Sequence, residues 1–293
     1  MYLLNLINNI LKKIFYIIYK ILLIVDSILN KIIRKRFFYW FREFLEKDSY
    51  KTKIINNKKI IFFTPNEIID WRVHTLFSKE PDTIEWIDKF NGEKIVFWDV
   101  GANIGLYSIY AAIKHKEIEI ISFEPSVNNL RVLSRNIYKN KLTDTIKIFQ
   151  LPLSEKANIF SNMNENEFIE GWSMSSFGDN INFEGENFLP KHNYKIFGTN
   201  INYLLDNKIL PFPNYIKIDV DGIEHKILNG ANKHLSGTNI KSILVELNED
   251  YSDQYHSVLN LMLKNNFTHN TKREFTPNKN KKFSKTLNHI FEK

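Results

Sequence analysis

The sequence contains no cysteine among its 293 residues. This absence excludes a disulfide framework, a thiolate metal site and a cysteine nucleophile. The sequence also lacks the 18 or more consecutive apolar residues of a confident transmembrane helix, because Lys20 interrupts the apolar run from Ile14 to Val25. No small-residue cleavage site follows a short apolar region near the start, so we expect no secretory signal peptide.

The formal net charge of +7 is distributed unevenly along the chain. Residues 1–47 and residues 264–293 each carry a net charge of +6, whereas residues 48–263 carry −5. A high proportion of basic residues is typical of nucleic-acid-binding proteins, but here these residues lie at the two ends. Hydrophobic residues make up 43% and charged residues 25%, which indicates an ordinary globular protein.

Residues 1–47 are predicted to form an amphipathic helical leader. Apolar residues recur at helical spacing from Tyr2 to about Arg34, and they leave a narrow face of Asn and Lys. A basic and aromatic segment, residues 34–40, follows and suits an anionic membrane interface. We therefore expect residues 1–45 to lie on the inner face of a membrane, which makes the protein cytoplasmic and peripheral. There are two alternatives. The helix could span the membrane once, or it could pack on its own domain or on a second subunit.

Residues 48–293 are predicted to form one α/β domain. Residues 50–63, around a polar turn, indicate a hairpin within a pre-domain segment of residues 48–93. Strands and helices then alternate, which is typical of a mostly parallel sheet with helices on both faces. The polar stretch of about 155–197 is too long for an ordinary connection, so we interpret it as an insertion on the substrate side. The expected strands are 94–100, 117–123, 145–150, 215–220 and 240–247, and the expected helices are 104–115, 127–139, 202–206, 224–234 and 252–265.

Two neighbouring strand ends carry the residues of a nucleoside site. Asp99 ends the first strand, and Gly101 and Gly105 follow it. Glycines permit positive φ and a close approach of the backbone to a ligand. Their spacing differs from the dinucleotide fingerprint G-x-G-x-x-G, and Asp99 suits a ligand with a cationic amine. Glu124 ends the next strand, where an acid accepts hydrogen bonds from both ribose hydroxyls.

Four segments in this order resemble the FkbM family of S-adenosylmethionine-dependent methyltransferases. They are Lys79–Ile87, Asp99–Ser108, Phe123–Pro125 and Lys217–Glu224, and the similarity covers roughly residues 70–265. The resemblance implies a Rossmann-like class I methyltransferase fold, with a mostly parallel seven-stranded sheet. It also implies O-methylation of sugar or polyketide hydroxyls.

The resemblance further implies which residues bind S-adenosylmethionine. The segment from Asp99 to Gly105 would shape the methionine pocket, and Glu124 would hold the ribose. Leu151–Ser154 occupy the place of a loop beside adenine and are bulkier than the residues usual there. The implied cofactor-binding residues are Asp99, Gly101, Ala102, Asn103, Gly105, Glu124, Pro125 and Asp219.

Methyl transfer to a hydroxyl requires that the acceptor oxygen be aligned and that its proton be removed. Asp219 and Glu246 are candidate bases, because they end the fourth and fifth strands, where doubly wound sheets bind ligands. His225 is a third candidate that titrates near neutral pH, or else a helix-face histidine. Asp219 and Glu246 with Asn248 could also hold Mg²⁺, but the predicted site contains no metal.

We therefore predict an S-adenosylmethionine-dependent O-methyltransferase that acts on a sugar, glycan or glycolipid precursor. Aromatic and hydroxyl side chains in Trp172–Phe177 suit a sugar ring, or else pack within a surface loop. A methyltransferase acting on another small molecule or on nucleic acid, and an inactive membrane-associated scaffold, are the alternatives. Enzymes that methylate the amino groups of nucleic-acid bases commonly carry an Asp/Asn-Pro-Pro-aromatic sequence after the fourth strand. This chain has Asp219–Gly222 at that place. Near the C-terminus, Leu287–Phe291 could be a last antiparallel strand preceded by a turn at Lys279–Lys282, or part of a basic tail.

Overall fold

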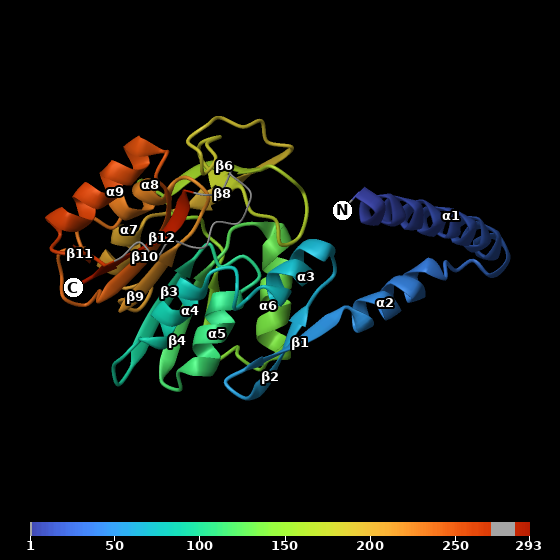
Figure 1. Cartoon of the computed structure of the whole chain (residues 1–293), viewed down its shortest axis with the longest axis horizontal. Helices are drawn as coiled ribbons and strands as arrows, with labels where there is room; N and C mark the ends of the chain where they lie inside the picture. The colour runs from blue at the N-terminus through green and yellow to red at the C-terminus, as the bar shows by residue number, and fades with distance from the viewer. Residues whose placement is uncertain (1, 271–284) are drawn as a thin grey trace. The chain divides into compact units, whose positions relative to one another are not determined.

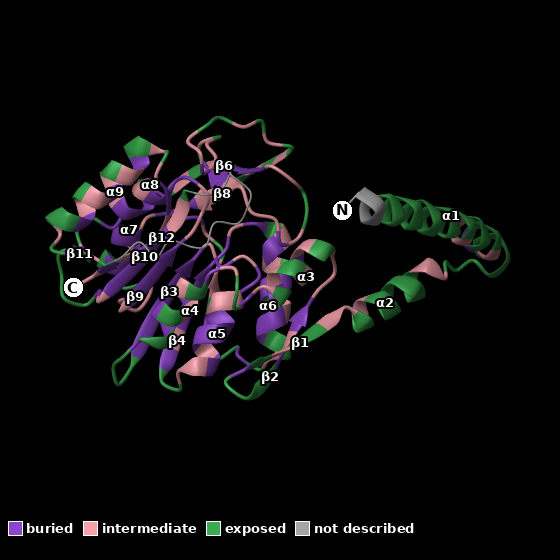
Figure 2. Ribbon diagram, in the orientation of Figure 1, coloured by how far each residue is buried: buried purple, intermediate pink, exposed green. Residues whose placement is uncertain are grey.

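The computed structural model describes residues 2–270 and 285–293, with side chains described from Leu6 onward. The chain forms two compact units, Met1–Tyr50 and Lys51–Lys293. The first unit consists of helices α1 (Tyr2–Ile33) and α2 (Phe38–Asp48), so the predicted N-terminal helix is confirmed. Most of the surface of both helices is exposed (Figure 2). None of the helices in the described ranges is both long enough and apolar enough to span a membrane.

An ion pair between buried Asp26 and half-exposed Arg36 fixes the turn between the two helices of the first unit. The Asp26 carboxylate accepts hydrogen bonds from Arg36 Nε at 2.8 Å and from the Phe38 backbone N–H at 3.2 Å. Burial raises the pKa of Asp26, but the hydrogen bonds from Arg36 and Phe38 outweigh it and the net pKa is lowered. The carboxylate therefore stays ionised and holds the start of α2.

The second unit begins with a hairpin of β1 (Tyr50–Ile55) and β2 (Lys58–Phe63). Its turn residues Asn56 and Asn57 have positive φ, which Asn tolerates better than most residues. The backbone N–H of Phe63 donates to Asn136 Oδ1 at 2.8 Å. This bond connects the hairpin to α6 (Val127–Lys139).

A seven-stranded sheet forms the centre of the second unit (Figure 1). The strand order is β11-β12-β10-β9-β3-β4-β5; β12 runs antiparallel to both β10 and β11, and the other described neighbours in this sheet pair in parallel. This topology confirms the predicted class I methyltransferase fold, including the last antiparallel strand. Residues 279–282, the expected turn before that strand, lie outside the described residues. The strands are β3 (Ile95–Val100), β4 (Ile118–Phe123), β5 (Ile146–Phe149), β9 (Tyr215–Ile218), β10 (Ser242–Asn248), β11 (Thr268–His269) and β12 (Thr286–Glu292).

Helices cover both faces of this sheet, as the continuous apolar strands require. On one face, Trp98 and Ile218 belong to a core that also contains residues of α7, α8 and α9. On the other face, the ring of Phe97 packs against that of Trp86 on α4, with 6.0 Å between the ring centroids. On the same face, Asp99 accepts a hydrogen bond from Ser108 on α5. The helices are α3 (Glu67–His74), α4 (Pro81–Asp88), α5 (Leu106–Lys114), α7 (Ile201–Asp206), α8 (Glu224–Asn229) and α9 (Ser252–Lys264).

The long stretch between β5 and α7 is more ordered than its polar sequence suggests. It contains a second, antiparallel sheet with the order β7-β6-β8, built from Ser175–Phe177, Ile159–Glu165 and His192–Gly198. Met163 and Phe177 of this sheet join the main hydrophobic core. The small sheet therefore packs on the end of the large sheet where the strands β3, β4 and β9 finish.

Candidate functional site

A pocket lies at the carboxyl ends of β3, β4 and β9. Its volume is roughly 560 Å³ with the open mouth included. The strand order reverses between the neighbouring strands β3 and β9: β4 and β5 lie on one side, and β10, β12 and β11 lie on the other. Open α/β sheets bind ligands at such switch points. The lining residues are Val100, Gly101, Asn103, Phe123, Glu124, Pro125, Asn129, Leu151, Pro152, Leu153, Met163, Trp172, Ser173, Ser175, Phe177, Asp219, Val220, Asp221, Ile223 and Ile227.

Glu124 is the buried carboxyl group of this pocket. Its oxygens accept hydrogen bonds from the backbone N–H groups of Asn103 at 2.7 Å and Ser126 at 2.9 Å. Burial raises the pKa of Glu124 to about 8 in spite of these two bonds, because the carboxylate is desolvated. The group is therefore poised to accept hydrogen bonds from a ligand that stabilises its ionised form.

Gly101 allows two strand ends to touch. Its φ is +85°, and a Cβ atom placed there would lie 1.9 Å from the carbonyl oxygen of Asp219. Gly101 lines the pocket, as the sequence predicts for a glycine beside a ligand, and it also leaves room for the backbone that follows β9. Gly105 has φ +84° and begins α5 against Leu133, whose Cδ1 atom would be 2.5 Å from a Cβ atom.

The remaining residues of the first motif lie in or near the pocket. The side chain of Asp99 is fully buried on the α5 face of the sheet, where it accepts a hydrogen bond from Ser108 Oγ at 2.5 Å. Burial raises the pKa of Asp99, and Lys217 partly opposes this effect. Ala102 is buried and donates its backbone N–H to Phe123, while Pro125 lines the pocket itself. Asp99 is not among the residues that line the pocket, and its side chain instead joins β3 to α5.

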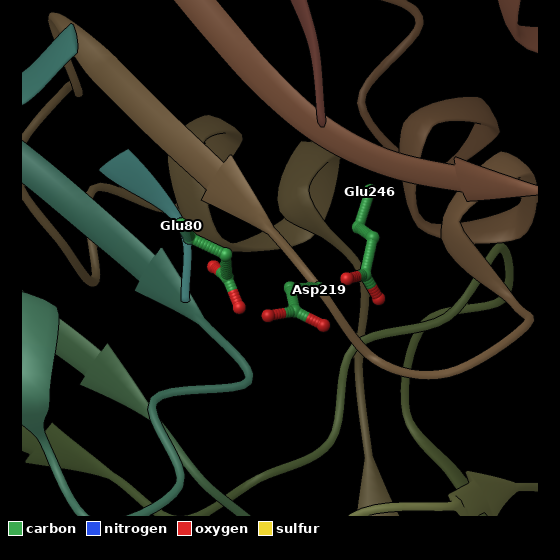
Figure 3. Close-up of side chains that lie close together, drawn as sticks. All are labelled: Glu80, Asp219 and Glu246. Carbon is green, nitrogen blue, oxygen red and sulfur yellow. The ribbon is translucent and has the colours of Figure 1, made fainter. Parts of the chain in front are cut away.

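A second group of side chains, which we call the carboxylate cluster, adjoins the pocket. It consists of Glu80, Asp219 and Glu246, whose nearest carboxylate oxygens all lie within 4.8 Å of one another (Figure 3). Glu80 precedes α4, Asp219 follows β9, and Glu246 belongs to β10. Asp219 also lines the pocket, so it connects the two groups.

Two lysines set the charges of the carboxylate cluster. Lys217, 1% exposed, donates to Asp219 at 2.6 Å, and Lys79 pairs with Glu80. Burial raises the pKa of Asp219, but Lys217 and Lys79 outweigh it and lower the pKa to about 2. Burial and the Asp219 charge raise the pKa of Glu246 well above its usual value. Asp219 is therefore ionised near neutral pH, and Glu246 loses its proton less readily than Asp219 does.

The donor set does not fit Mg²⁺ well. Three carboxylates suit a hard cation, but the ammonium groups of Lys79 and Lys217 already neutralise two of them. Asn248, the third expected ligand, donates to the carbonyl oxygen of Phe183 at 3.1 Å and accepts from the Asp250 N–H. The charges of the cluster are balanced by this chain's own residues.

His225 does not join Asp219 and Glu246. It lies at the start of α8, 3.4 Å from Gln254 Nε2, and its ring contacts that of Tyr251. Burial and Lys226 lower its pKa. The residue is not among those that line the pocket.

Sequence reasoning missed several residues of the site. Glu80 is distant in sequence from β9 and β10, and its segment was noted only for its resemblance to a family segment. Lys217 did have a local signal, because a lysine within a buried apolar strand requires a partner. The sequence prediction did not use this signal. Leu151, Pro152 and Leu153, expected beside adenine, do line the pocket, and so do Trp172 and Ser173 of the insertion.

Comparison with known proteins agrees with this arrangement. The family model described as the methyltransferase FkbM domain matches residues 99–269. The hexuronic acid methyltransferase AglP of Haloferax volcanii is 24% identical over 191 residues, which cover 62% of this chain and 69% of that protein. The methyltransferase sdnD of Sordaria araneosa is 42% identical over 59 residues, 20% of this chain, and the match spans only 23% of its length.

A solved structure with a similar chain path is the precorrin-6y C5,15-methyltransferase of Geobacter metallireducens. It superposes with a TM-score of 0.40 and 13% sequence identity, over 85% of this chain and 95% of that chain.

Proposed function

Since the chain belongs to the FkbM family of S-adenosylmethionine-dependent methyltransferases, we propose that it methylates a hydroxyl oxygen of a sugar, glycan or glycolipid precursor. The observation that carries this proposal is the double position of Asp219. It lines the pocket that holds Gly101 and Glu124, and it belongs to the carboxylate cluster with Glu246. A cofactor bound in the pocket and a proton acceptor in the carboxylate cluster would thus both lie next to Asp219.

The pocket residues fit S-adenosylmethionine. Glu124 is proposed to accept hydrogen bonds from the ribose hydroxyls, because its carboxylate is buried in the pocket wall. Leu151 and Leu153 offer an apolar surface to the adenine ring. Gly101 and Asn103 form the turn on the methionine side, and Asp99 joins the two elements that flank this turn.

The carboxylate cluster is proposed to accept the proton of the acceptor hydroxyl. When bound, S-adenosylmethionine supplies a methyl group on a positively charged sulfur. Glu246, once ionised, is a stronger base than Asp219 because its pKa is raised and that of Asp219 is lowered. Asp219 and Glu80 are proposed to align the acceptor, so that its oxygen would replace the sulfur on the methyl carbon, with the carbon–sulfur electron pair staying on sulfur, while the hydroxyl proton passes to ionised Glu246.

The acceptor class rests on a distant relative and on the site. AglP is named as a hexuronic acid methyltransferase, which supports a sugar acceptor. Ionised carboxylates, such as that of Asp219, accept hydrogen bonds from hydroxyl groups, which a sugar supplies. Nucleic acid fits less well, because the region that forms the site is acidic overall and phosphate groups would be repelled.

The cofactor half of the proposal is tested by calorimetry with S-adenosylhomocysteine. The native protein should bind it, and Glu124→Gln should weaken binding by about tenfold, because a neutral amide accepts hydrogen bonds less strongly than a carboxylate. Since the pKa of Glu124 is about 8, ionisation above that pH should tighten native binding, and Glu124→Gln should remove this pH dependence. Glu117→Gln, at an exposed surface position, is the matched control. Absence of binding to the native protein would refute the proposal.

The acceptor half is tested by mass spectrometry of surface glycans. A strain without the gene should lack one methyl increment, and the native gene should restore it. Restoration by the Glu124→Gln gene should be weaker. Unchanged glycans in the deletion strain would reject a glycan acceptor.

We also propose that α1 lies on an anionic membrane surface. It exposes large apolar side chains along much of its length, including Ile14, Phe15 and Ile21, and its lysines interrupt them. Lys and Arg beside exposed apolar residues favour anionic headgroups. The turn fixed by Asp26 and Arg36 places further aromatic and basic residues at the start of α2.

A further inference from the structure

The insertion contributes a wall to the pocket that the family motifs form. Trp172 and Ser173 line it together with Gly101 and Glu124. We propose that Trp172 is a cofactor-positioning residue that closes the pocket over the nucleoside part of S-adenosylmethionine. This inference rests on the proposed function, and it places Trp172 with the cofactor and not with the methyl acceptor.

A chain of hydrogen bonds connects Trp172 to the residue expected to hold the ribose. Asn103 donates its backbone N–H to Glu124 at 2.7 Å and its side-chain amide to the carbonyl oxygen of Trp172 at 3.0 Å. Asn129 donates a second side-chain hydrogen bond to the same carbonyl oxygen at 3.2 Å. Trp172 is therefore tied to the Glu124 side of the pocket.

The loop that carries Trp172 is held in place on both sides. Before it, the Gly171 N–H donates to Asn129 Oδ1 at 2.8 Å, and the Gly171 carbonyl accepts from Arg72 Nε at 2.7 Å. After it, the Met174 N–H donates to Asp221 Oδ2 at 2.7 Å. A loop fixed by its own protein costs little further ordering when a ligand binds.

Two polar atoms at this wall point to a ligand. The indole N–H of Trp172 and the side-chain oxygen of Asn103 are shielded from solvent and have no hydrogen-bond partner within the described ranges. Buried polar groups are normally paired in folded proteins, so such atoms beside a pocket indicate a missing partner. One atom is a donor and the other an acceptor, and a nucleoside offers both.

The aromatic ring adds a reason why the occupant is a nucleoside. A planar base packs well on an indole face, because every base presents a π-face on which an aromatic side chain can stack. Phe123, Leu153 and Phe177 complete an apolar lining. Glu80 and Glu246 of the carboxylate cluster are not among the residues that line this pocket.

The test compares Trp172→Ala and Trp172→Phe with Trp71→Phe, which changes an exposed tryptophan on α3. Binding of S-adenosylhomocysteine is measured by calorimetry and by tryptophan fluorescence. We expect Trp172→Ala to weaken binding by about tenfold and Trp172→Phe by less, because phenylalanine keeps part of the stacking surface. The fluorescence change on binding should persist in Trp71→Phe and disappear in Trp172→Phe.

Native-like affinity of both Trp172 variants would overturn the inference while the native protein still binds S-adenosylhomocysteine. Unchanged affinity together with a raised KM for the methyl acceptor would also overturn it and would assign Trp172 to the acceptor. If Trp172→Ala fails to fold, the fluorescence of folded Trp172→Phe decides alone. Failure of the native protein to bind would instead refute the proposed function.

Discussion

At the scale of single residues, the environment shifts the pKa values of Asp219 and Glu246 in opposite directions. Lys217 and Lys79 lie close to Asp219 and lower its pKa to about 2, despite burial. Glu246 is half-buried beside that negative charge, and desolvation together with the charge raises its pKa well above the usual value. Two adjacent carboxyl groups cannot both ionise easily, and Asp219, which accepts a hydrogen bond from Lys217, ionises before Glu246.

This difference predicts the pH dependence of catalysis. A base with a raised pKa is ionised only at higher pH, so kcat should rise with pH as Glu246 loses its proton. Glu246→Gln should lower kcat by about 10²–10⁴-fold and flatten the profile, because an amide accepts no proton. S-adenosylhomocysteine affinity should change by less than about twofold, since Glu246 does not line the pocket.

Steady-state rates across a pH series check this prediction, with Glu117→Gln as a control at an exposed acid. A Glu246→Gln enzyme with native kcat would exclude Glu246 as the base. In that case Asp219 would be the remaining candidate in the carboxylate cluster.

At the scale of elements, the turn between β3 and α5 depends on contact with the segment after β9. Gly101 has positive φ and leaves no space for a side chain beside the Asp219 carbonyl. The same turn places Asn103 against Glu124, at the end of β4. One glycine thus keeps three strand ends in their relative positions.

Gly101→Ala should therefore destabilise the protein by about 2 kcal/mol or more, because strained φ and overpacking both contribute. A thermal melt should show a lower Tm, and calorimetry should show weaker S-adenosylhomocysteine binding. Gly237→Ala is the control, because a Cβ atom there meets its nearest neighbour at an ordinary 3.4 Å. Equal melting temperatures for the two variants would contradict this account of the turn.

At the scale of the whole molecule, the two ends of the sequence carry the positive charge and the region between them is acidic. The proposed membrane contact of α1 follows from this distribution together with its exposed apolar side chains. The apolar side chains supply a salt-independent attraction, and the lysines supply an attraction that salt screens.

The full-length protein should co-sediment with vesicles that contain phosphatidylglycerol and less with neutral vesicles. Changing Lys12, Lys13 and Lys20 to Glu should reduce the bound fraction, and so should about 1 M salt. The paired change Lys58→Glu and Lys59→Glu, at the exposed start of β2, is the control. Deletion of residues 1–45 should move the protein to the soluble fraction. Unchanged sedimentation after deletion would refute membrane contact by α1.

The local pattern of the sequence determined the elements of the α/β domain. Apolar strands and amphipathic helices have periods that can be read directly, so the expected β3, β4, β5, β9 and β10 agree with the structure within a few residues. Boundaries were less accurate, since α8 ends at Asn229 and not at residue 234. The small sheet of the insertion was missed because its short strands are rich in polar residues.

The sequence by itself therefore determined the αβ alternation, the motif residues at the strand ends and the amphipathic N-terminal helix. Only the tertiary structure decided which side chains meet. It brought Glu80 beside Asp219 and Glu246, placed Trp172 in the pocket wall and left His225 outside it. The physical reason is that periodicity records which face of an element is buried. Contacts between residues distant in sequence depend instead on how the strands and loops pack at the edge of the sheet.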